Sequence, residues 1–452
     1  MKLFFRILRA EGGGAVVRRI LERIDERRQK QSYPILDPRL ADASESRPAN
    51  SPLINFVSSP PARRLGGGSI QLLDRLRIEA RVRPVALLAA WRDRFRLQFE
   101  SGSSRWACEF ERGAVPSPIA EDPAFETAMM EAAARVGAST IHCEGLANVS
   151  LVSLANLARR GLRLILSVHD FALHCPRANL LEAGSESRFC GYCQDLARCH
   201  RCLRRSWPIE QEELRKHREV ATAVLTFAEA VVYPSDFLRD QHRRLFAQAA
   251  PKRDLVIEPA VAGSVATACV RAVERPRHLA FVGAVTEPKG AKVFEEAVRA
   301  LRQCSTSEIR FSVFGGGDSE ILMRLRRIEG VAVHGYYRAG TLPEVLRRQR
   351  VDLALILSIV PEAFGLTLSE CWSAGISVLA FDHGAVAERI RKHGGGVLAG
   401  PDPTPAAVVQ TLGPILDGSR GVEGSAGAIE LPTPESMAAS FQRLYEEVGL
   451  FR

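Results

Sequence analysis

The sequence predicts an α/β fold in which two doubly wound domains face each other across a cleft. The chain has 452 residues, which is more than one hydrophobic core accommodates. From residue 51 onward, short apolar runs alternate with helix-like segments, the order expected of parallel sheets. Some runs, such as Leu353–Leu357, are apolar throughout, as in strands that are buried on both faces.

Changes in composition predict the domain boundaries. Residues 1–50 contain a basic amphipathic segment and a linker rich in Pro, Ser and Asp. Residues 51–262 form the predicted first domain, with a Cys-rich loop at 174–203, and residues 275–432 form the second. An amphipathic helix within residues 433–452 is expected to cross back to the first domain.

Positive charge is concentrated near the beginning of the chain. The formal net charge is +9, and residues 1–30 hold nine Lys or Arg against four Asp or Glu. Apolar residues at helical spacing lie among them, which is typical of a helix on an anionic membrane surface and equally of a helix packed on a domain. No run of 18 apolar residues occurs, and no segment has the pattern of a signal peptide. We therefore expect a cytoplasmic protein with no nucleic-acid partner. Attachment at the inner face of the plasma membrane is one interpretation of the basic segment, and a helix packed on the domain or a frayed tail is the alternative.

The first domain is predicted to begin with a strand, a glycine-rich loop and a helix. The strand is Leu53–Val57, the loop contains Gly66–Gly68, and the helical pattern covers Ile70–Ile78. Backbone N–H groups in such a loop suit a phosphate or an acceptor, although an ordinary surface loop has the same composition. Leu87–Phe99 does not match one element, and Trp106–Glu111 is typical of an edge strand.

Two histidines lie at the ends of neighbouring predicted strands. Thr140–Cys143 contains His142, and Leu162–Val168 leads directly into His169. Because the carboxyl ends of parallel strands border the ligand crevice, each histidine is a candidate for contact with a ligand. The alternative for each is a structural histidine that hydrogen-bonds the backbone.

A cluster of cysteines follows His169. The pairs Cys190-x2-Cys193 and Cys199-x2-Cys202 have the spacing of tetrahedral zinc ligands, and Cys175 is an alternative ligand. The spacing predicts a structural zinc site rather than a catalytic one, because no open ligand position is indicated. Free thiols, or a redox or iron–sulfur role, remain the alternatives.

In the predicted second domain, Lys289 lies in the turn between a strand at His278–Val282 and a helix at Ala291–Leu301. Its ammonium group is placed to reach a diphosphate, whereas the ordinary alternative is a solvated loop lysine.

The stretch Val360–Glu388 carries the strongest functional signal. A loop with Glu362 leads to Gly365 and then to a helix that contains Glu370, before a strand at Ser377–Phe381. Two carboxylates that accept hydrogen bonds from hydroxyls thus flank a helix N-terminus, which attracts phosphate. A nucleotide-sugar presents a sugar and a ribose on either side of a diphosphate, and therefore fits this pattern. Two solvated helix-start charges are the alternative.

Three segments resemble the retaining GT-B glycosyltransferases of family 4. PEAFGLTLSECWSAGISVLAFDHGAVAE resembles the E-x7-E motif of that family and its following strand, and FVGAVTEPKG resembles its strand-loop-Lys element. SVHDFALHCPRANLL with the cysteines after it resembles a subgroup used in bacterial surface-polysaccharide assembly. The resemblance implies a GT-B fold of two Rossmann-like domains, a glycosyltransferase of the hexosyltransferase type, and no cofactor for catalysis.

The resemblance also assigns roles to individual residues. Glu362 would bind the donor sugar hydroxyls, Glu370 the ribose, and Lys289 the departing diphosphate. His169 would touch the donor sugar, as the third member of the predicted catalytic set. The remaining predicted donor-binding residues are Phe364, Gly365, Leu366, Thr367, Gly283, His334 and Gly335, and the loop of Gly66, Gly67 and Gly68 would lie near acceptor and phosphate.

The implied reaction transfers a sugar from a UDP- or GDP-sugar to a saccharide or lipid-linked acceptor, in cell-surface polysaccharide biosynthesis. One position departs from the family pattern, because Ala284 stands where many relatives have an Arg for the diphosphate. Arg63, Arg64 and Arg338 are candidate substitutes. A nucleotide-sugar epimerase of the same fold, a phosphorylase and an inactive GT-B scaffold are the alternative functions.

Overall fold

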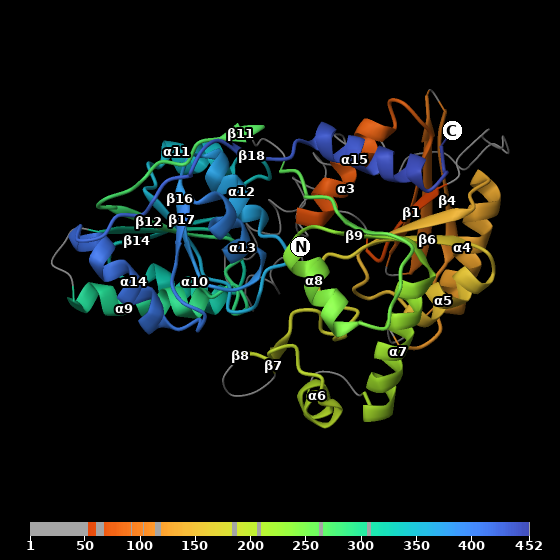
Figure 1. Ribbon diagram of the computed structural model, residues 1–452, viewed down its shortest axis with the longest axis horizontal. Helices are drawn as coiled ribbons and strands as arrows, with labels where there is room; N and C mark the ends of the chain where they lie inside the picture. The colour runs from red at the N-terminus through yellow and green to blue at the C-terminus, as the bar shows by residue number, and fades with distance from the viewer. Residues whose placement is uncertain are drawn as a thin grey trace, which may run out of the picture.

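Two α/β units, each built on one large sheet, make up the chain (Figure 1). The computed structural model describes residues 53–59, 67–91, 93–102, 104–113, 119–182, 188–205, 209–261, 265–304 and 309–451. The predicted N-terminal segment 1–50, Gly66, Arg63 and Arg64 lie outside these residues. Within them, no helix is long and apolar enough to cross a membrane.

The first sheet has eight strands in the order β10-β9-β6-β5-β1-β2-β3-β4. From β10 to β2 neighbouring strands are parallel, whereas β3 and β4 are added antiparallel. The run at 87–99 is therefore divided between two strands of a hairpin, and β4 forms the sheet edge that its sequence predicts. The bounds are β1 (Leu53–Val57), β2 (Val85–Ala90), β3 (Arg94–Ser101), β4 (Ser104–Glu111), β5 (Thr140–Glu144), β6 (Arg163–Ser167), β9 (Ala228–Tyr233) and β10 (Asp254–Val256).

Helices cover both faces of this sheet. One face packs against a core that includes Phe125, Leu154 and Val224, and the other against residues such as Phe441 and Leu72. The first face is covered by α4 (Pro123–Val136), α5 (Leu151–Arg159), α7 (Gln211–Phe227) and α8 (Asp236–Leu245), and the second by α3 (Gly67–Glu79) and α15 (Pro434–Glu447).

The second sheet has six strands, all parallel, in the order β14-β13-β12-β15-β16-β17. Counted along the chain this is the order 3-2-1-4-5-6, so the topological switch point lies between β12 and β15. The strands are β12 (His278–Val282), β13 (Arg310–Phe314), β14 (Val331–Gly335), β15 (Leu353–Ile356), β16 (Ser377–Ala380) and β17 (Gly396–Leu398). One face is covered by α9 (Ala291–Cys304), α10 (Ser319–Arg326) and α14 (Pro405–Asp417), and the other by α11 (Leu342–Arg348), α12 (Leu366–Ser373) and α13 (Gly384–His393).

Hydrogen bonds join the two units next to the switch point. The Ser235 hydroxyl caps α8 by accepting from Leu238 N at 3.1 Å, as its sequence position predicts. The same hydroxyl donates to the carbonyl of Ala363 in the second unit at 2.6 Å. Phe237 N also donates to the Glu388 carboxylate at 3.3 Å, so the start of α8 is held against the second unit at two points.

The C-terminal helix α15 lies beside α3 on the first unit, after the chain has completed the second (Figure 1). A short antiparallel pair, β11 (Thr267–Ala268) with β18 (Ile429–Glu430), aligns the outgoing and returning chain segments. The returning chain thus contributes apolar side chains, including Leu444 and Tyr445, to the core of the first unit.

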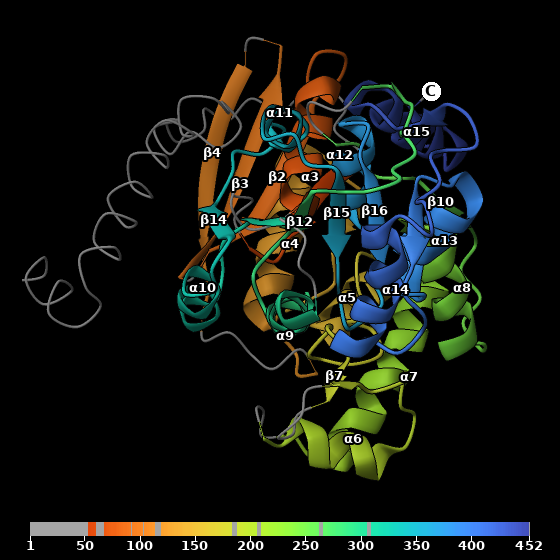
Figure 2. The ribbon, with the colours of Figure 1, turned by 90° about the vertical axis from the view of Figure 1, so that its left-hand side faces the viewer.

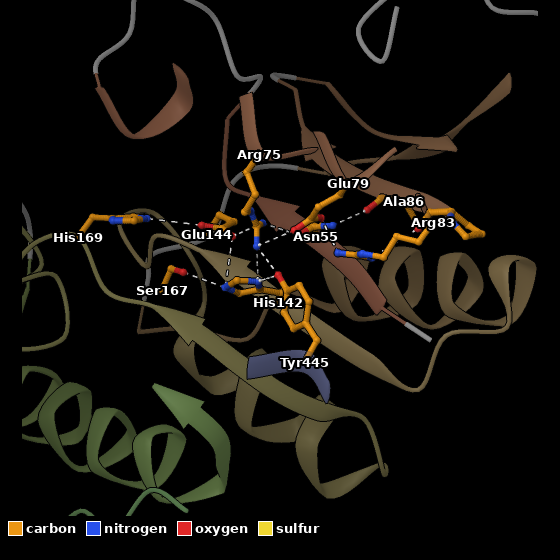
Figure 3. Close-up of polar contacts among 11 residues, drawn as sticks. Asn55, Arg75, Glu79, Arg83, Ala86, His142, Glu144, Ser167, His169 and Tyr445 are labelled. Atoms are coloured by element: carbon orange, nitrogen blue, oxygen red, sulfur yellow. Dashed lines mark hydrogen bonds and ion pairs between the residues drawn. The ribbon is translucent and has the colours of Figure 1, made fainter. Parts of the chain in front are cut away.

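A buried polar network anchors α15 (Figure 3). Arg75 of α3 donates to Glu144 at 2.5 Å and to the Tyr445 hydroxyl of α15. The Tyr445 hydroxyl also lies 2.8 Å from Nδ1 of His142, whose Nε2 lies 2.8 Å from the Ser167 hydroxyl. Burial lowers the pKa of His142 to about 3, so this histidine is neutral and structural.

We expect Tyr445→Phe to lower the free energy of unfolding by about 2 kcal/mol, because it leaves buried donors of Arg75 and an acceptor of His142 without their shared partner. Urea unfolding followed by circular dichroism measures the change. Tyr336→Phe is the matched control, since Tyr336 is 71% exposed. Equal stabilities for the two variants would show that the network does not anchor α15.

Candidate functional site

The loops that follow β12 and β15 meet at the switch point of the second sheet. Nζ of Lys289 lies 2.5 Å from Oε1 of Glu362, and the two side chains are 40% and 18% exposed. Gly290 brings the loops this close, because a Cβ there would lie 1.7 Å from the carbonyl oxygen of Leu357. Two predicted catalytic residues thus form one ion pair that solvent reaches.

The Glu362 carboxylate is held in its ionised form. Burial alone would raise its pKa, but the charge and hydrogen bond of Lys289, with the Ser358 hydroxyl, hold the pKa below its ordinary value. His383 donates to the carbonyl of Ser358 at 2.8 Å and so supports the same loop. Neither Ser358 nor His383 is among the residues predicted from the sequence, although each follows a buried strand as His169 does.

The N-terminus of α12 lies directly after this loop. Gly365 precedes the helix with a φ of +79°, and within the described chain no side chain caps the helix. Its first backbone N–H groups, on Leu366 and Thr367, are therefore available to an anion. A Cβ at Gly365 would lie 2.4 Å from Val386, so only glycine fits this position without displacing α13.

Arg389 of α13 is buried and contacts the start of α12. Its guanidinium lies 4.0 Å above the Phe364 ring and donates to the Ser369 hydroxyl at 2.7 Å. It also donates to the carbonyls of Phe364 and Gly365, each at 3.4 Å. The sequence pattern gave no signal for this role, because a buried arginine cannot be distinguished from an exposed one on an amphipathic helix.

Glu370 lies in the second turn of α12 and is 9% exposed. Burial raises its pKa to about 7, so this carboxyl exchanges its proton near neutral pH. The E-x7-E pair therefore contains two different groups, an ionised Glu362 that is paired with lysine and a buried Glu370.

The other side of the switch point is built from closely packed glycines. Gly283 has a φ of +130°, and a Cβ on Gly315 would lie 1.7 Å from its carbonyl oxygen. His334 of β14 stacks on Phe314 with 4.4 Å between ring centroids, and Gly335 accepts a hydrogen bond from Gly315 N at 2.8 Å. The predicted donor-binding residues Gly283, His334 and Gly335 are therefore neighbours in space.

Ala284 follows Gly283 in this loop. Of the cations suggested to substitute for arginine there, Arg338 is exposed in the segment after β14. Arg63 and Arg64 fall outside the described residues.

The first unit contributes a pocket with an empty volume of about 370 Å³ at the carboxyl ends of β5, β6 and β9. His169 lines it and is 36% exposed, with its Nε2 3.6 Å from a Glu144 carboxylate oxygen (Figure 3). His142, the other strand-end candidate, is fully buried in the Arg75 network. Of the two histidines, only His169 faces this pocket. Gly67 and Gly68 begin α3, so the helix starts earlier than its apolar pattern predicts.

The five clustered cysteines line a second pocket, of about 420 Å³. It lies in a segment that projects from the first unit and comprises β7 (Leu181–Glu182), β8 (Arg188–Phe189) and α6 (Leu196–Leu203) (Figures 1 and 2). Within the described residues none of the five forms a disulfide, and no group of three or more ligands is arranged to hold a metal ion. The structure therefore brings the predicted zinc ligands to one pocket, and a zinc site there stays a prediction. These ligands are Cys175, Cys190, Cys193, Cys199 and Cys202.

Residues 276–417 match the family described as Glycosyl transferases group 1. Among solved structures, sucrose-phosphate synthase from Thermosynechococcus elongatus superposes with a TM-score of 0.58 at 16% identity, over 88% of this chain and 99% of that one. Anabaena HepE, in complex with UDP and glucose, gives 0.54 at 15% identity, over 89% and 100%. A glycosyltransferase from Rickettsia africae gives 0.53 at 12% identity, over 88% and 99%.

The chain has the GT-B fold. The match to sucrose-phosphate synthase covers 88% of the chain and therefore extends over both units. The family match covers only the second unit, which contains Lys289, Glu362 and Glu370. No curated protein is similar to the chain at the sequence level. The predicted two-domain α/β fold is thus confirmed, and the roles of single residues stay predictions.

The raised pKa of Glu370 predicts a pH dependence of stability. Between pH 4.5, its ordinary pKa, and about 7, the folded chain holds a proton that the unfolded chain releases. This contribution to the free energy of unfolding is present at low pH and is lost as pH rises through about 7, by at most on the order of 3 kcal/mol.

Glu370→Gln should therefore flatten the decline of stability over this range, as measured by urea unfolding at several pH values. Glu344→Gln, at an exposed helix-start glutamate, is the control. An unchanged decline in Glu370→Gln would show that Glu370 titrates as an ordinary carboxyl.

Proposed function

We propose that the chain is a retaining glycosyltransferase of the hexosyltransferase type, which moves a sugar from a UDP- or GDP-sugar to a saccharide or lipid-linked acceptor. The observation that carries this proposal is the pairing of Lys289 with Glu362 beside the uncapped start of α12, at the switch point of the second sheet. The glycosyl transferases group 1 match to this unit, and the UDP and glucose bound by the similar HepE, support it. The proposal includes a role in cell-surface polysaccharide biosynthesis, with the basic segment 1–30 held at the inner face of the plasma membrane.

In the proposed reaction, the donor diphosphate binds the N-terminal N–H groups of α12. The bound diphosphate would compete with the Glu362 carboxylate for the ion pair with Lys289, because one ammonium group then has two anions within reach. Lys289 then neutralises the leaving diphosphate, and the released Glu362 carboxylate orients the sugar hydroxyls. The N–H groups are fixed before the reaction by the packing of Arg389, so their alignment costs little in the transition state.

The ribose is proposed to bind Glu370, and the base to lie near His334. Because Glu370 accepts hydrogen bonds from two hydroxyls only when it is ionised, binding of a nucleotide near neutral pH should release a proton.

Glu362→Ala and Lys289→Ala should each lower turnover by about 100-fold or more, while the protein stays folded. The measurement is transfer from a panel of labelled UDP- and GDP-sugars. Lys292→Ala is the matched control, because Lys292 forms a similar ion pair with Glu287 on the exposed side of α9 and takes no part in the proposed reaction. Near wild-type turnover in both test variants would contradict the assignment.

Product analysis separates the proposed transferase from an epimerase of the same fold. The proposed retaining transferase requires an acceptor and forms a glycoside with the anomeric configuration of the donor. An epimer of the donor sugar formed without acceptor would identify the alternative reaction.

We also propose that four of the five clustered cysteines hold a structural zinc ion. The support is that all five line one pocket, next to Arg177 and Arg218, whose guanidinium groups contact Cys202 and Cys199. Burial raises the pKa of Cys199 to about 12, so zinc would have to displace its proton and binding should strengthen as pH rises.

The purified chain should contain about one zinc per molecule by elemental analysis. Cys199→Ala should lose most of it, whereas Cys269→Ala, at an exposed cysteine far along the chain, should not. Equal zinc contents in both variants would refute a site in this loop.

A further inference from the structure

Arg389 of α13 is a buried cation that has no anion beside it. It is 5% exposed, and its hydrogen-bond acceptors are the carbonyls of Phe364 and Gly365 and the Ser369 hydroxyl. All three acceptors are uncharged, and Arg389 forms no ion pair with any carboxylate of the described residues. A buried charge is normally paired, because moving an ion out of water costs more free energy than neutral hydrogen bonds return. The position of Arg389 therefore calls for an anion that the described chain does not supply.

Arg75 shows how a buried arginine is usually accommodated. It is 1% exposed and pairs with Glu144 at 2.5 Å. Burial would lower the pKa of Arg75, but the charge of Glu144 raises it above the ordinary value. For Arg389, burial lowers the pKa to about 10, and the charges of Glu258 and Glu388 do not offset this effect. Arg389 is thus a cation at neutral pH whose charge the described chain leaves largely unbalanced.

Both carbonyls that Arg389 contacts belong to peptide groups at the start of α12. The Phe364 carbonyl shares its peptide group with the N–H of Gly365, and the Gly365 carbonyl shares its peptide group with the N–H of Leu366. These peptide groups are trans, so each N–H points away from the guanidinium. Neither N–H donates a hydrogen bond to a described residue. A cation at the carbonyl end polarises a peptide group and strengthens its N–H as a donor, so the charge of Arg389 is carried to the uncapped end of the helix.

The predicted diphosphate site is short of positive charge. Ala284 stands where the resemblance led us to expect an arginine, and Lys289 is paired with Glu362. A diphosphate carries more than one negative charge, so one lysine and the N–H groups of a helix leave part of it unbalanced. The anion that Arg389 lacks and the cation that the diphosphate lacks would thus lie at opposite ends of the same two peptide groups.

We propose that Arg389 supplies positive charge to the donor diphosphate through the peptide groups that join Phe364, Gly365 and Leu366, and so replaces the arginine that is absent at Ala284. The inference rests on the proposed glycosyltransferase function and adds a residue to its donor site. Arg389 is a positioning residue, because it does not touch the ligand and acts through the N–H groups that it polarises.

Two substitutions separate the charge of Arg389 from its hydrogen bonds. Arg389→Met removes both, whereas Arg389→Gln removes the charge and keeps amide N–H donors for the two carbonyls. Each should weaken the binding of UDP and GDP to the full chain by about tenfold, since each removes a unit charge from a site that water reaches poorly. Isothermal titration calorimetry at one fixed salt concentration measures the affinities.

Arg391→Met is the matched control. Arg391 lies on the same helix, is 56% exposed and pairs with Asp382, so its loss changes the net charge of the chain equally. Because salt and water screen an exposed charge, this variant should bind UDP and GDP within about twofold of the wild type.

The nucleosides uridine and guanosine provide a second control, since they lack the diphosphate. Their affinities, followed by ligand-observed NMR, should be the same in the wild type and in both Arg389 variants. An equal loss of nucleoside and nucleotide affinity would show that the substitution distorts the site, and would overturn the inference.

Two further results would overturn it: Arg389→Gln binds nucleotides as well as the wild type, or Arg391→Met weakens binding as much as Arg389→Met does. If Arg389→Met does not fold, as judged by circular dichroism, Arg389→Gln gives the comparison of affinities. A wild type that binds UDP or GDP, with unchanged affinity in the Arg389 variants, refutes only the role of Arg389. A wild type that binds neither nucleotide refutes the proposed function, and this inference with it.

Discussion

The parallel pairing of β12 with β15 is the constraint on which the proposed site depends. Leu279 pairs with Leu353 and Phe281 with Leu355, so the two strands end at the same edge of the sheet. After β12 the chain continues to β13 on one side of the pair, and after β15 it continues to β16 on the other side. The loops therefore start side by side, and Lys289 and Glu362 come within 2.5 Å although 73 positions separate them.

A second constraint is the return of the chain to the first unit. Arg75, buried in α3, joins Glu144 at a strand end to Tyr445 of α15. The same carboxylate faces His169, so the network that fixes the helix also fixes one wall of the pocket. The hydrogen bond from Ser235 to Ala363 separately joins the segment after β9 to the segment after β15.

Local patterns in the sequence predicted much of this structure. Continuous apolar runs located the parallel strands, and the spacing of Glu362 and Glu370 located α12, because both signals arise from neighbouring residues. Contacts between distant residues left no such signal. Arg75 and Tyr445 are 370 positions apart, and nothing in their surroundings distinguishes them from exposed residues. In the sequence, His142 and His169 have the same position at the end of a predicted strand. His142 is buried because Tyr445 of α15 packs against it, and the pattern of the strands contains no information about that contact.

The central claim is that an activated sugar binds by its diphosphate between Glu362 and Glu370. A crystal structure of the chain with UDP or GDP tests this most directly. The account predicts the diphosphate at the first N–H groups of α12, the ribose within hydrogen-bonding distance of Glu370, and Lys289 turned from Glu362 toward the phosphates. The account would be contradicted by a nucleotide that binds elsewhere, with the Lys289–Glu362 ion pair intact and no phosphate at the N-terminus of α12.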